Sequence, residues 1–171
     1  MIWRDVSALT SRRPFTRLAL IVVLCLACTA APCKYAPHLT IRTSFFGRSP
    51  RGDGLVDWAI AQRGRSIEGF LDYRFTGLSA ALLADLVVAA IGARAPLEGV
   101  CHVGGEPVTK HELLAAIGQE LHLDLRVVPV GRGKVDRTLN ADRFFAALGR
   151  QRPTLAESVA TLGSCGVLSR S

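Results

Sequence analysis

Apolar and polar positions alternate along residues 39–163 with two periods, one typical of strands and one of helices. β-branched and aromatic residues predict strands at LTIRTSFF (39–46), SIEGF (66–70), GVCHVG (99–104) and LRVVPV (125–130). Apolar residues spaced three and four apart predict helices over 55–63, 80–91, 110–121, 141–148 and 155–162. Because strands and helices alternate, the sequence predicts an α/β fold with strands that are at least partly parallel.

Polar residues mark where two of these helices begin. Thr109 is followed three residues later by Glu112, and Thr154 is followed in the same way by Glu157. This spacing is that of a capping box, in which each side chain bonds the other residue's backbone amide. The stretch DYRFTGL (72–78) has no such pattern, and we predict a polar loop there.

A different pattern occupies the beginning of the chain. Four arginines come first: Arg4, Arg12, Arg13 and Arg17. An uncharged apolar run, 18–31, follows, and this order is that of a signal peptide. The run is shorter than the ~20 residues of a membrane-spanning helix. It also fits a buried strand or helix, or sequence with no selected structure. We therefore divide the chain into a signal-like or unstructured segment (1–36), one domain (37–163) and a tail (164–171).

Composition narrows the choice of partner. With 49% hydrophobic and 20% charged residues the chain is globular in composition. Its formal charge of +7 raises the question of nucleic acid. The basic residues are mostly scattered arginines, however, and only 6% of residues are aromatic. No basic run is interleaved with aromatics, so we predict no nucleic-acid partner.

Cofactor and metal motifs are absent from the sequence. The histidines and cysteines do not have the spacing of zinc ligands, and we predict no metal. The stretch GRGK (131–134) lacks both the first glycine and the Ser/Thr of a phosphate-binding loop. No G-x-G-x-x-G fingerprint occurs anywhere in the chain. The sequence therefore contains no motif to bind the nicotinamide cofactor that hydride transfer requires.

Polar side chains that follow strands are the remaining candidates for chemistry. Ligands of α/β folds gather at the carboxyl ends of strands, and arginine suits pyrophosphate. The alternative is that these residues only satisfy the backbone of their loops. The candidate residues for binding a substrate are Arg42, Thr43, Ser44, Arg48, Arg74 and Arg137.

Longer stretches carry a family resemblance. LTIRTSFFGRSP (39–50), the region GLVDWAIAQRGRSIEGFLDYRFTGLSAALLADLVVAAI (54–91) and LEGVCHVGGEPVTKHELLAAI (97–117) resemble the carboxyl-terminal half of extended short-chain dehydrogenases. The most similar group is the dTDP-4-dehydrorhamnose reductase (RmlD-like) sugar-nucleotide family. DRTLNADRF (136–144) is similar to the late loop of that family. The resemblance implies an incomplete extended short-chain dehydrogenase fold, the substrate-binding half without the amino-terminal glycine-loop unit.

The resemblance also implies a function. The family uses NAD(P) to reduce or epimerise a nucleotide-linked sugar, with a Tyr-x-x-x-Lys pair that this chain lacks. By position, the four candidates at 42–48 would lie beside the sugar nucleotide. Arg74 and Arg137 would close over its phosphates or its sugar. FTGLS (75–79) replaces the usual G-x-P-T of the family, which weakens the assignment to the rhamnose enzyme itself.

Three functional hypotheses follow. In the first, the chain is a partial one, the substrate-binding portion of a sugar-nucleotide reductase whose cofactor half was lost by truncation or a shifted reading frame. It is then inactive alone and binds no NAD(P) by itself. This hypothesis favours the cytoplasm as the location of the chain. It leaves open whether the chain is an enzyme. In the alternative, residues 18–31 act as a signal, and the chain is an exported or membrane-anchored binding protein without catalysis. In a further hypothesis, the chain is an interaction subunit that completes a separate cofactor-binding (Rossmann) chain.

Overall fold

The computed structural model describes residues 39–93, 97–131 and 133–164. The signal-like segment 1–36 and the tail after Ser164 lie outside these residues, so the division into domains stays a prediction. The strands are β1 (Leu39–Phe46), β2 (Ser66–Phe70), β3 (Tyr73–Phe75), β4 (Gly77–Ser79), β5 (Gly99–Val103), β6 (Val108–Thr109), β7 (Arg126–Val130) and β8 (Val135–Arg137).

Five helices lie within the described residues. They are α2 (Leu55–Ala61), α3 (Ala80–Ile91), α4 (Lys110–Glu120), α5 (Asp142–Leu148) and α6 (Leu155–Ser164). None of these described helices has the combination of length and apolar composition that crossing a membrane requires.

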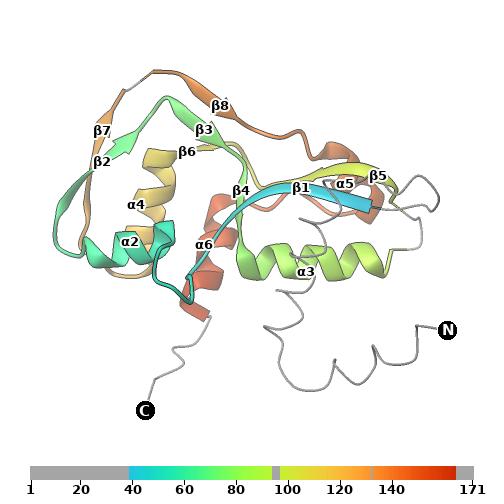
Figure 1. Ribbon diagram of the computed structural model, residues 1–171, viewed down its shortest axis with the longest axis horizontal. Coiled ribbons are helices and arrows are strands. Elements are labelled where there is room, and N and C mark those ends of the chain that lie inside the picture. Colours follow the sequence, from blue (N-terminus) through green and yellow to red (C-terminus); the bar gives the residue numbers. More distant parts are fainter. Residues whose placement is uncertain (1–38, 94–96, 132, 165–171) are drawn as a thin grey trace, which may run out of the picture.

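The strands form three small sheets with the orders β4-β1-β5, β2-β7 and β6-β3-β8. All pairs are parallel except β3 with β6. In Figure 1 the sheet around β1 lies at one end of the molecule, beside α3 and α5. The pair β2-β7 lies at the other end with α2 and α4, and β3 and β8 run between the two ends. The predicted α/β fold with partly parallel strands is confirmed.

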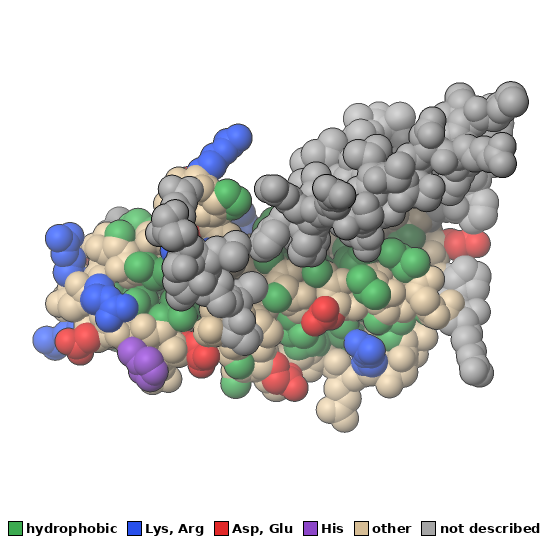
Figure 2. Space-filling view, turned by 90° about the horizontal axis from the view of Figure 1, so that it is seen from below, with side chains coloured by type: hydrophobic (Ala, Val, Ile, Leu, Met, Phe, Trp, Pro, Cys, Tyr) green, Lys and Arg blue, Asp and Glu red, His purple; other side chains and the backbone are tan. Residues whose placement is uncertain are grey.

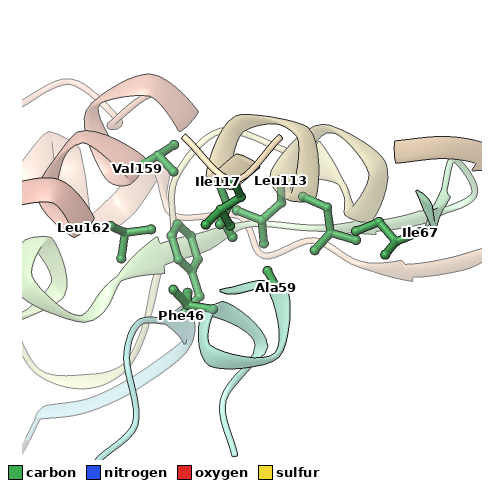
Figure 3. Close-up of a cluster of buried hydrophobic side chains, with 10 residues drawn as sticks. Phe46, Ala59, Ile67, Leu113, Ile117, Val159 and Leu162 are labelled. Carbon is green, nitrogen blue, oxygen red and sulfur yellow. The ribbon is translucent and has the colours of Figure 1, made fainter. Parts of the chain in front are cut away.

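Two hydrophobic clusters hold these layers together. The first joins β1, β2, α2, α4 and α6, and Figure 3 shows Phe46, Ile117 and Leu162 pointing into it from three of these elements. The second joins α3, α5 and β5, and its largest side chain, Phe144, is fully buried. Burying one such side chain contributes about 1.5–3 kcal/mol. The clusters therefore fix the sheet around β1 to the rest of the fold.

Local patterns predicted the starts of α4 and α6 correctly. Thr109 caps α4 in a capping box with Glu112, and Thr154 makes the same bonds with Glu157 at α6. The predicted polar loop at 72–78 is wrong, because that stretch contains β3 and the beginning of β4. Its partners in β6, β8 and β1 lie far away in the chain, so short-range pattern did not indicate these strands.

Candidate functional site

The crossing from β3 to β4 is tied to two other parts of the chain. Thr76, which separates the two strands, is fully buried. Its Oγ1 accepts a hydrogen bond of 3.1 Å from the backbone amide of Leu139. Gly104, just after β5, packs so closely that a Cβ there would lie 2.7 Å from the carbonyl oxygen of Thr76. The crossing is therefore a fixed point between the sheet of β1 and the sheet of β3.

Two aromatic rings and an arginine lie on one face of β3. Side chains alternate along a strand, so Tyr73 and Phe75 share a face. Their ring centroids are 6.3 Å apart in an edge-to-face arrangement. Arg137 is the register partner of Phe75 in β8, and its guanidinium carbon lies 5.6 Å from the centroid of the Tyr73 ring. We call Tyr73, Phe75 and Arg137 the aromatic row.

The aromatic row lies next to the end of β1 at Gly77 of β4. Ser44 is the register partner of Gly77 in β4. A Cβ at Gly77 would lie 2.6 Å from Cε2 of Phe75, so the Phe75 ring covers the place where a side chain would be. Ser44 points to this same face by register, and Arg42 shares it by alternation. The structure thus places three of the predicted residues, Arg42, Ser44 and Arg137, on the side of the aromatic row.

A hollow of about 370 Å³ lies between β5 and the beginning of α5. One of its lining residues is His102, the register partner of Arg42. Asn140 and Arg143 line it from the α5 side. Arg143 donates to the carbonyl oxygens of Glu98 (2.7 Å) and Val100 (3.4 Å), so its guanidinium is engaged with the backbone. His102 is thus the lining residue that lies next to Arg42 in register.

Arg74 lies on the opposite face of β3 from Arg137. Its register partners are Asp136 in β8 and Thr109 in β6. The pKa of Asp136 is lowered, first by the hydrogen bond from the Thr138 amide and also by the positive charges of Arg74 and Lys134. Arg74 therefore sits among carboxylates. The alternation of the strand separates the two arginines that we expected to close over one ligand.

The two other predicted residues have local partners. Thr43 lies on the face of β1 opposite Ser44, and its hydroxyl donates to the Ser44 carbonyl oxygen at 3.3 Å. Arg48 forms an ion pair of 3.3 Å with Asp57 of α2. The same carboxylate accepts the Ser49 amide at 2.6 Å. These contacts show how both residues shape the end of β1 and the loop that follows it.

Sequence reasoning missed Tyr73 and Phe75 as parts of the candidate site. The signal was the alternation Tyr-Arg-Phe, which places two aromatic rings on one face if the stretch is a strand. Because the stretch was interpreted as a loop, this alternation was not used. Both rings are half-buried, and Phe75 packs against the first hydrophobic cluster.

The described residues do not fit a nicotinamide dinucleotide. Its pyrophosphate needs a free helix amino end and a glycine-rich approach. The buried Ser79 hydroxyl accepts the Leu82 amide at α3 and also receives a bond from Thr161 of α6. The carboxylates of Asp57 and Glu112 occupy the first turns of α2 and α4. These two carboxylates would repel a phosphate at the amino ends of α2 and α4. In the described ranges no three His, Cys, Asp or Glu side chains are grouped to hold a metal ion.

Comparison with known proteins supports the fold. No protein-family model matches the sequence, and no curated protein matches it. Among solved structures, the chain is similar to dTDP-4-dehydrorhamnose reductase from Bacillus anthracis in complex with NADP. The TM-score is 0.61 at 18% identity over 74% of this chain and 48% of that one.

Two further structures are similar. A GDP-6-OMe-4-keto-L-xylo-heptose reductase from C. jejuni has a TM-score of 0.59 at 11% identity, covering 85% of this chain and 58% of that one. UDP-glucuronic acid 4-epimerase from Bacillus cereus in complex with NAD has a TM-score of 0.56 at 14% identity, covering 84% and 46%. This chain therefore spans about half the length of the structures it matches.

The class of fold follows from these likenesses. The described residues have the α/β fold of about half of a sugar-nucleotide short-chain dehydrogenase. The resemblance to dTDP-4-dehydrorhamnose reductases and related sugar-nucleotide enzymes is confirmed at the level of fold.

Proposed function

We propose that this chain binds a nucleotide-linked sugar and forms the substrate-binding part of an NAD(P)-dependent sugar-nucleotide reductase. The observation that carries the proposal is the aromatic row, which joins Arg137, Tyr73 and Phe75 to Ser44 at the end of β1. The likeness in fold to enzymes named for nucleotide sugars supports the choice of ligand.

The chemistry of the aromatic row suits the parts of such a ligand. A guanidinium binds the diphosphate with charge-assisted hydrogen bonds. The stacked position of Arg137 over Tyr73 orients it, since cations prefer the face of an aromatic ring. The half-buried ring of Tyr73 would offer flat apolar surface to a base or a sugar, while Phe75 holds that ring edge-to-face from the core side. The hydroxyl of Ser44 is a donor and acceptor for a sugar hydroxyl.

The predicted residues would then have different roles. Arg42, Ser44 and Arg137 would contact the ligand from the side of the aromatic row. Arg48 would position the β1–α2 loop through its ion pair of 3.3 Å with Asp57. Thr43 and Arg74 would support the site from the opposite faces of β1 and β3.

The cofactor belongs to another polypeptide in this proposal. Side chains of this chain cap the amino ends of α3 and α4, so NAD(P) would be held by a separate cofactor-binding half. The isolated chain is then expected to show no reductase turnover, because the hydride donor is not positioned. We propose the cytoplasm as its location, since the proposed ligand is a cytoplasmic nucleotide sugar.

Titration calorimetry of the full chain tests the proposal. We expect dTDP-glucose to bind, and Arg137→Ala to weaken binding about tenfold or more, because a charged hydrogen bond contributes about 1.5–3 kcal/mol. Arg150→Ala is the matched control, since Arg150 is also exposed but lies at the far end of α5. Equal affinities for the two variants, or no binding to the unchanged chain, would refute the proposal.

A further inference from the structure

A groove lies between α4 and the turn and strand that follow this helix. Its volume is about 480 Å³, which is within the range of about 300–1,000 Å³ that ligand sites occupy. Helix α4 lines the groove with His111, Ala115 and Gln119, and the chain after α4 lines it with His122, Leu125 and Val127. His111 and Gln119 are eight residues apart on the helix, so the groove extends along α4 for about 12 Å. The groove is therefore long enough for a short stretch of extended chain.

The edge of β7 that borders this groove has no strand beside it in the part of the chain that the structure describes. β7 pairs with β2 in a sheet of two strands. The Arg126 amide donates to the Arg65 carbonyl oxygen at 3.0 Å, so the backbone of Arg126 faces β2. Backbone groups alternate along a strand, and those of Val127 and Pro129 therefore face away from β2. Proline is typical of such an edge, because it has no amide to pair. No lining residue of the groove belongs to β2, so the groove lies on this outer side.

The walls of the groove are held in place by packing and by backbone hydrogen bonds. A Cβ at Gly118 would lie 3.3 Å from the Cβ of Leu125, so α4 packs closely on the residue before β7. Leu123 is buried in the turn between them, and its amide donates to the Gly118 carbonyl oxygen at 2.9 Å. The Leu123 carbonyl oxygen accepts the Gly64 amide, also at 2.9 Å. A preformed groove orders little on binding, and this raises the affinity for a ligand.

The end of the groove at His122 is basic. Arg63 donates to the carbonyl oxygen of His122 at 2.8 Å, which brings residues 63–65 beside residues 122–126. These two segments contain one acidic side chain, on Asp124, and four basic ones, on Arg63, Arg65, His122 and Arg126. The ion pairs between described residues involve none of these three arginines. In Figure 2, Lys and Arg side chains gather at the end of the molecule that holds α2 and the β2-β7 pair in Figure 1. This end of the groove therefore favours a ligand with negative charge.

We propose that this groove binds an extended acidic peptide of a partner protein, which adds to the outer edge of β7 as a further strand. A groove between a strand edge and a helix suits this mode, because the edge bonds the peptide backbone and the walls receive alternate side chains. Val127 supplies an amide and a carbonyl oxygen to the peptide backbone. Apolar side chains of the peptide contact Ala115 and Leu125, and its carboxylates face Arg63 and His122. Four extended residues span about 13 Å, which matches the length of the groove.

Fluorescence anisotropy with a labelled peptide tests the groove. The probe is Glu-Val-Glu-Val-Glu with fluorescein at its amino end, and the full chain is titrated into it. We expect saturable binding, and Gln119→Trp, which fills the groove, should weaken it about tenfold or more. Gln151→Trp is the matched control, because Gln151 is also an exposed glutamine but lies between α5 and α6, outside the groove. Arg63→Ala should weaken binding about fivefold, whereas Arg150→Ala should not. No binding of the probe, or equal affinities for the two tryptophan variants, would overturn the proposal.

Hydrogen exchange of the unchanged chain, followed by NMR, shows whether the peptide adds as a strand. The probe should slow exchange of the Val127 amide about tenfold and leave that of the Val100 amide in β5 unchanged. A Lys-Val-Lys-Val-Lys peptide should bind at least about tenfold more weakly than the probe. Three results would each refute the proposal: binding that protects no β7 amide, equal affinity for the two peptides, and protection that rises with protein concentration without peptide, which would indicate a second copy. The groove shares no residue with the aromatic row, so displacement of the probe by dTDP-glucose would also refute it, while failure here would leave the sugar-nucleotide site untouched.

Discussion

The capping box at the start of α4 should stabilise the fold in a pH-dependent way. The Thr109 amide donates to Oε2 of Glu112 at 2.6 Å, and the Glu112 amide donates to Oγ1 of Thr109 at 3.1 Å. The Thr109 hydroxyl also donates to Oε2 at 2.9 Å. Thr109→Ala removes both bonds that use the hydroxyl. We expect a loss of about 1 kcal/mol in the free energy of unfolding at pH 7.

The pH dependence comes from Glu112. Its pKa is lowered from 4.5, first by the hydrogen bond from the Thr109 amide and, against the opposing effect of desolvation, by the Thr109 hydroxyl and by the charges of Arg74 and His111. A lowered pKa in the folded state means that the stabilisation is fully present above about pH 4.5. It is lost as the pH falls through the folded-state value. Glu112→Gln keeps the side-chain acceptor and removes the charge, so it isolates this part.

Urea unfolding followed by circular dichroism measures both effects. At pH 7 Glu112→Gln should unfold at lower urea than the unchanged chain, and the difference should shrink toward zero at pH 3. Thr154→Ala is the matched control, because Thr154 forms the same box with Glu157, whose pKa is also lowered. Only the change at Thr109 should alter the fluorescence of Tyr73, since β6 pairs with β3. An equal difference at pH 7 and pH 3 would refute the reasoning.

Three further changes test the packing by unfolding measurements of the same kind. Phe144→Ala should cost about 3–5 kcal/mol, because this side chain is fully buried in the second cluster; a loss below 1 kcal/mol would contradict the packing. Gly69→Ala should destabilise by about 1–3 kcal/mol, because its Cβ would lie 2.6 Å from Cγ1 of Val127. Gly92→Ala, whose Cβ would meet nothing nearer than 3.7 Å, should not destabilise, and a similar loss for both glycines would exclude a clash. Thr76→Val should cost about 1–3 kcal/mol by leaving the partly buried backbone amide of Leu139 unpaired, and an unchanged stability would show that water reaches this amide.

The elements that the sequence predicted well are those set by neighbours in the chain. The helix starts at Thr109 and Thr154 depend on a carboxylate three residues away, and both were recognised. β3 and β4 depend on partners far away, since Tyr73 pairs with Val135 and Gly77 with Ser44. Each of these strands has only three residues, which is too short for a period-2 pattern to stand out.

The same cause limited the prediction of the site. Arg74 and Arg137 were grouped because the family resemblance implies that both close over the phosphates or the sugar of the ligand. Once β3 and β8 pair in parallel register, alternation sends Arg74 toward Asp136 and Arg137 toward Tyr73. Residue type therefore indicated which side chains could bind a phosphate. The strand face that each side chain occupies depended on pairing between segments that are distant in the chain. The prediction that Arg42, Thr43 and Ser44 follow the first strand is wrong, because all three lie within β1.

The most direct test of the account compares the affinity of the full chain for two nucleotides. Titration calorimetry with dTDP-glucose and with NADPH, at the same protein concentration and salt, measures whether this chain holds the sugar nucleotide or the cofactor. The account predicts binding of dTDP-glucose that Arg137→Ala weakens, and no measurable binding of NADPH. Binding of NADPH as tight as that of dTDP-glucose, unaffected by the change at Arg137, would contradict it.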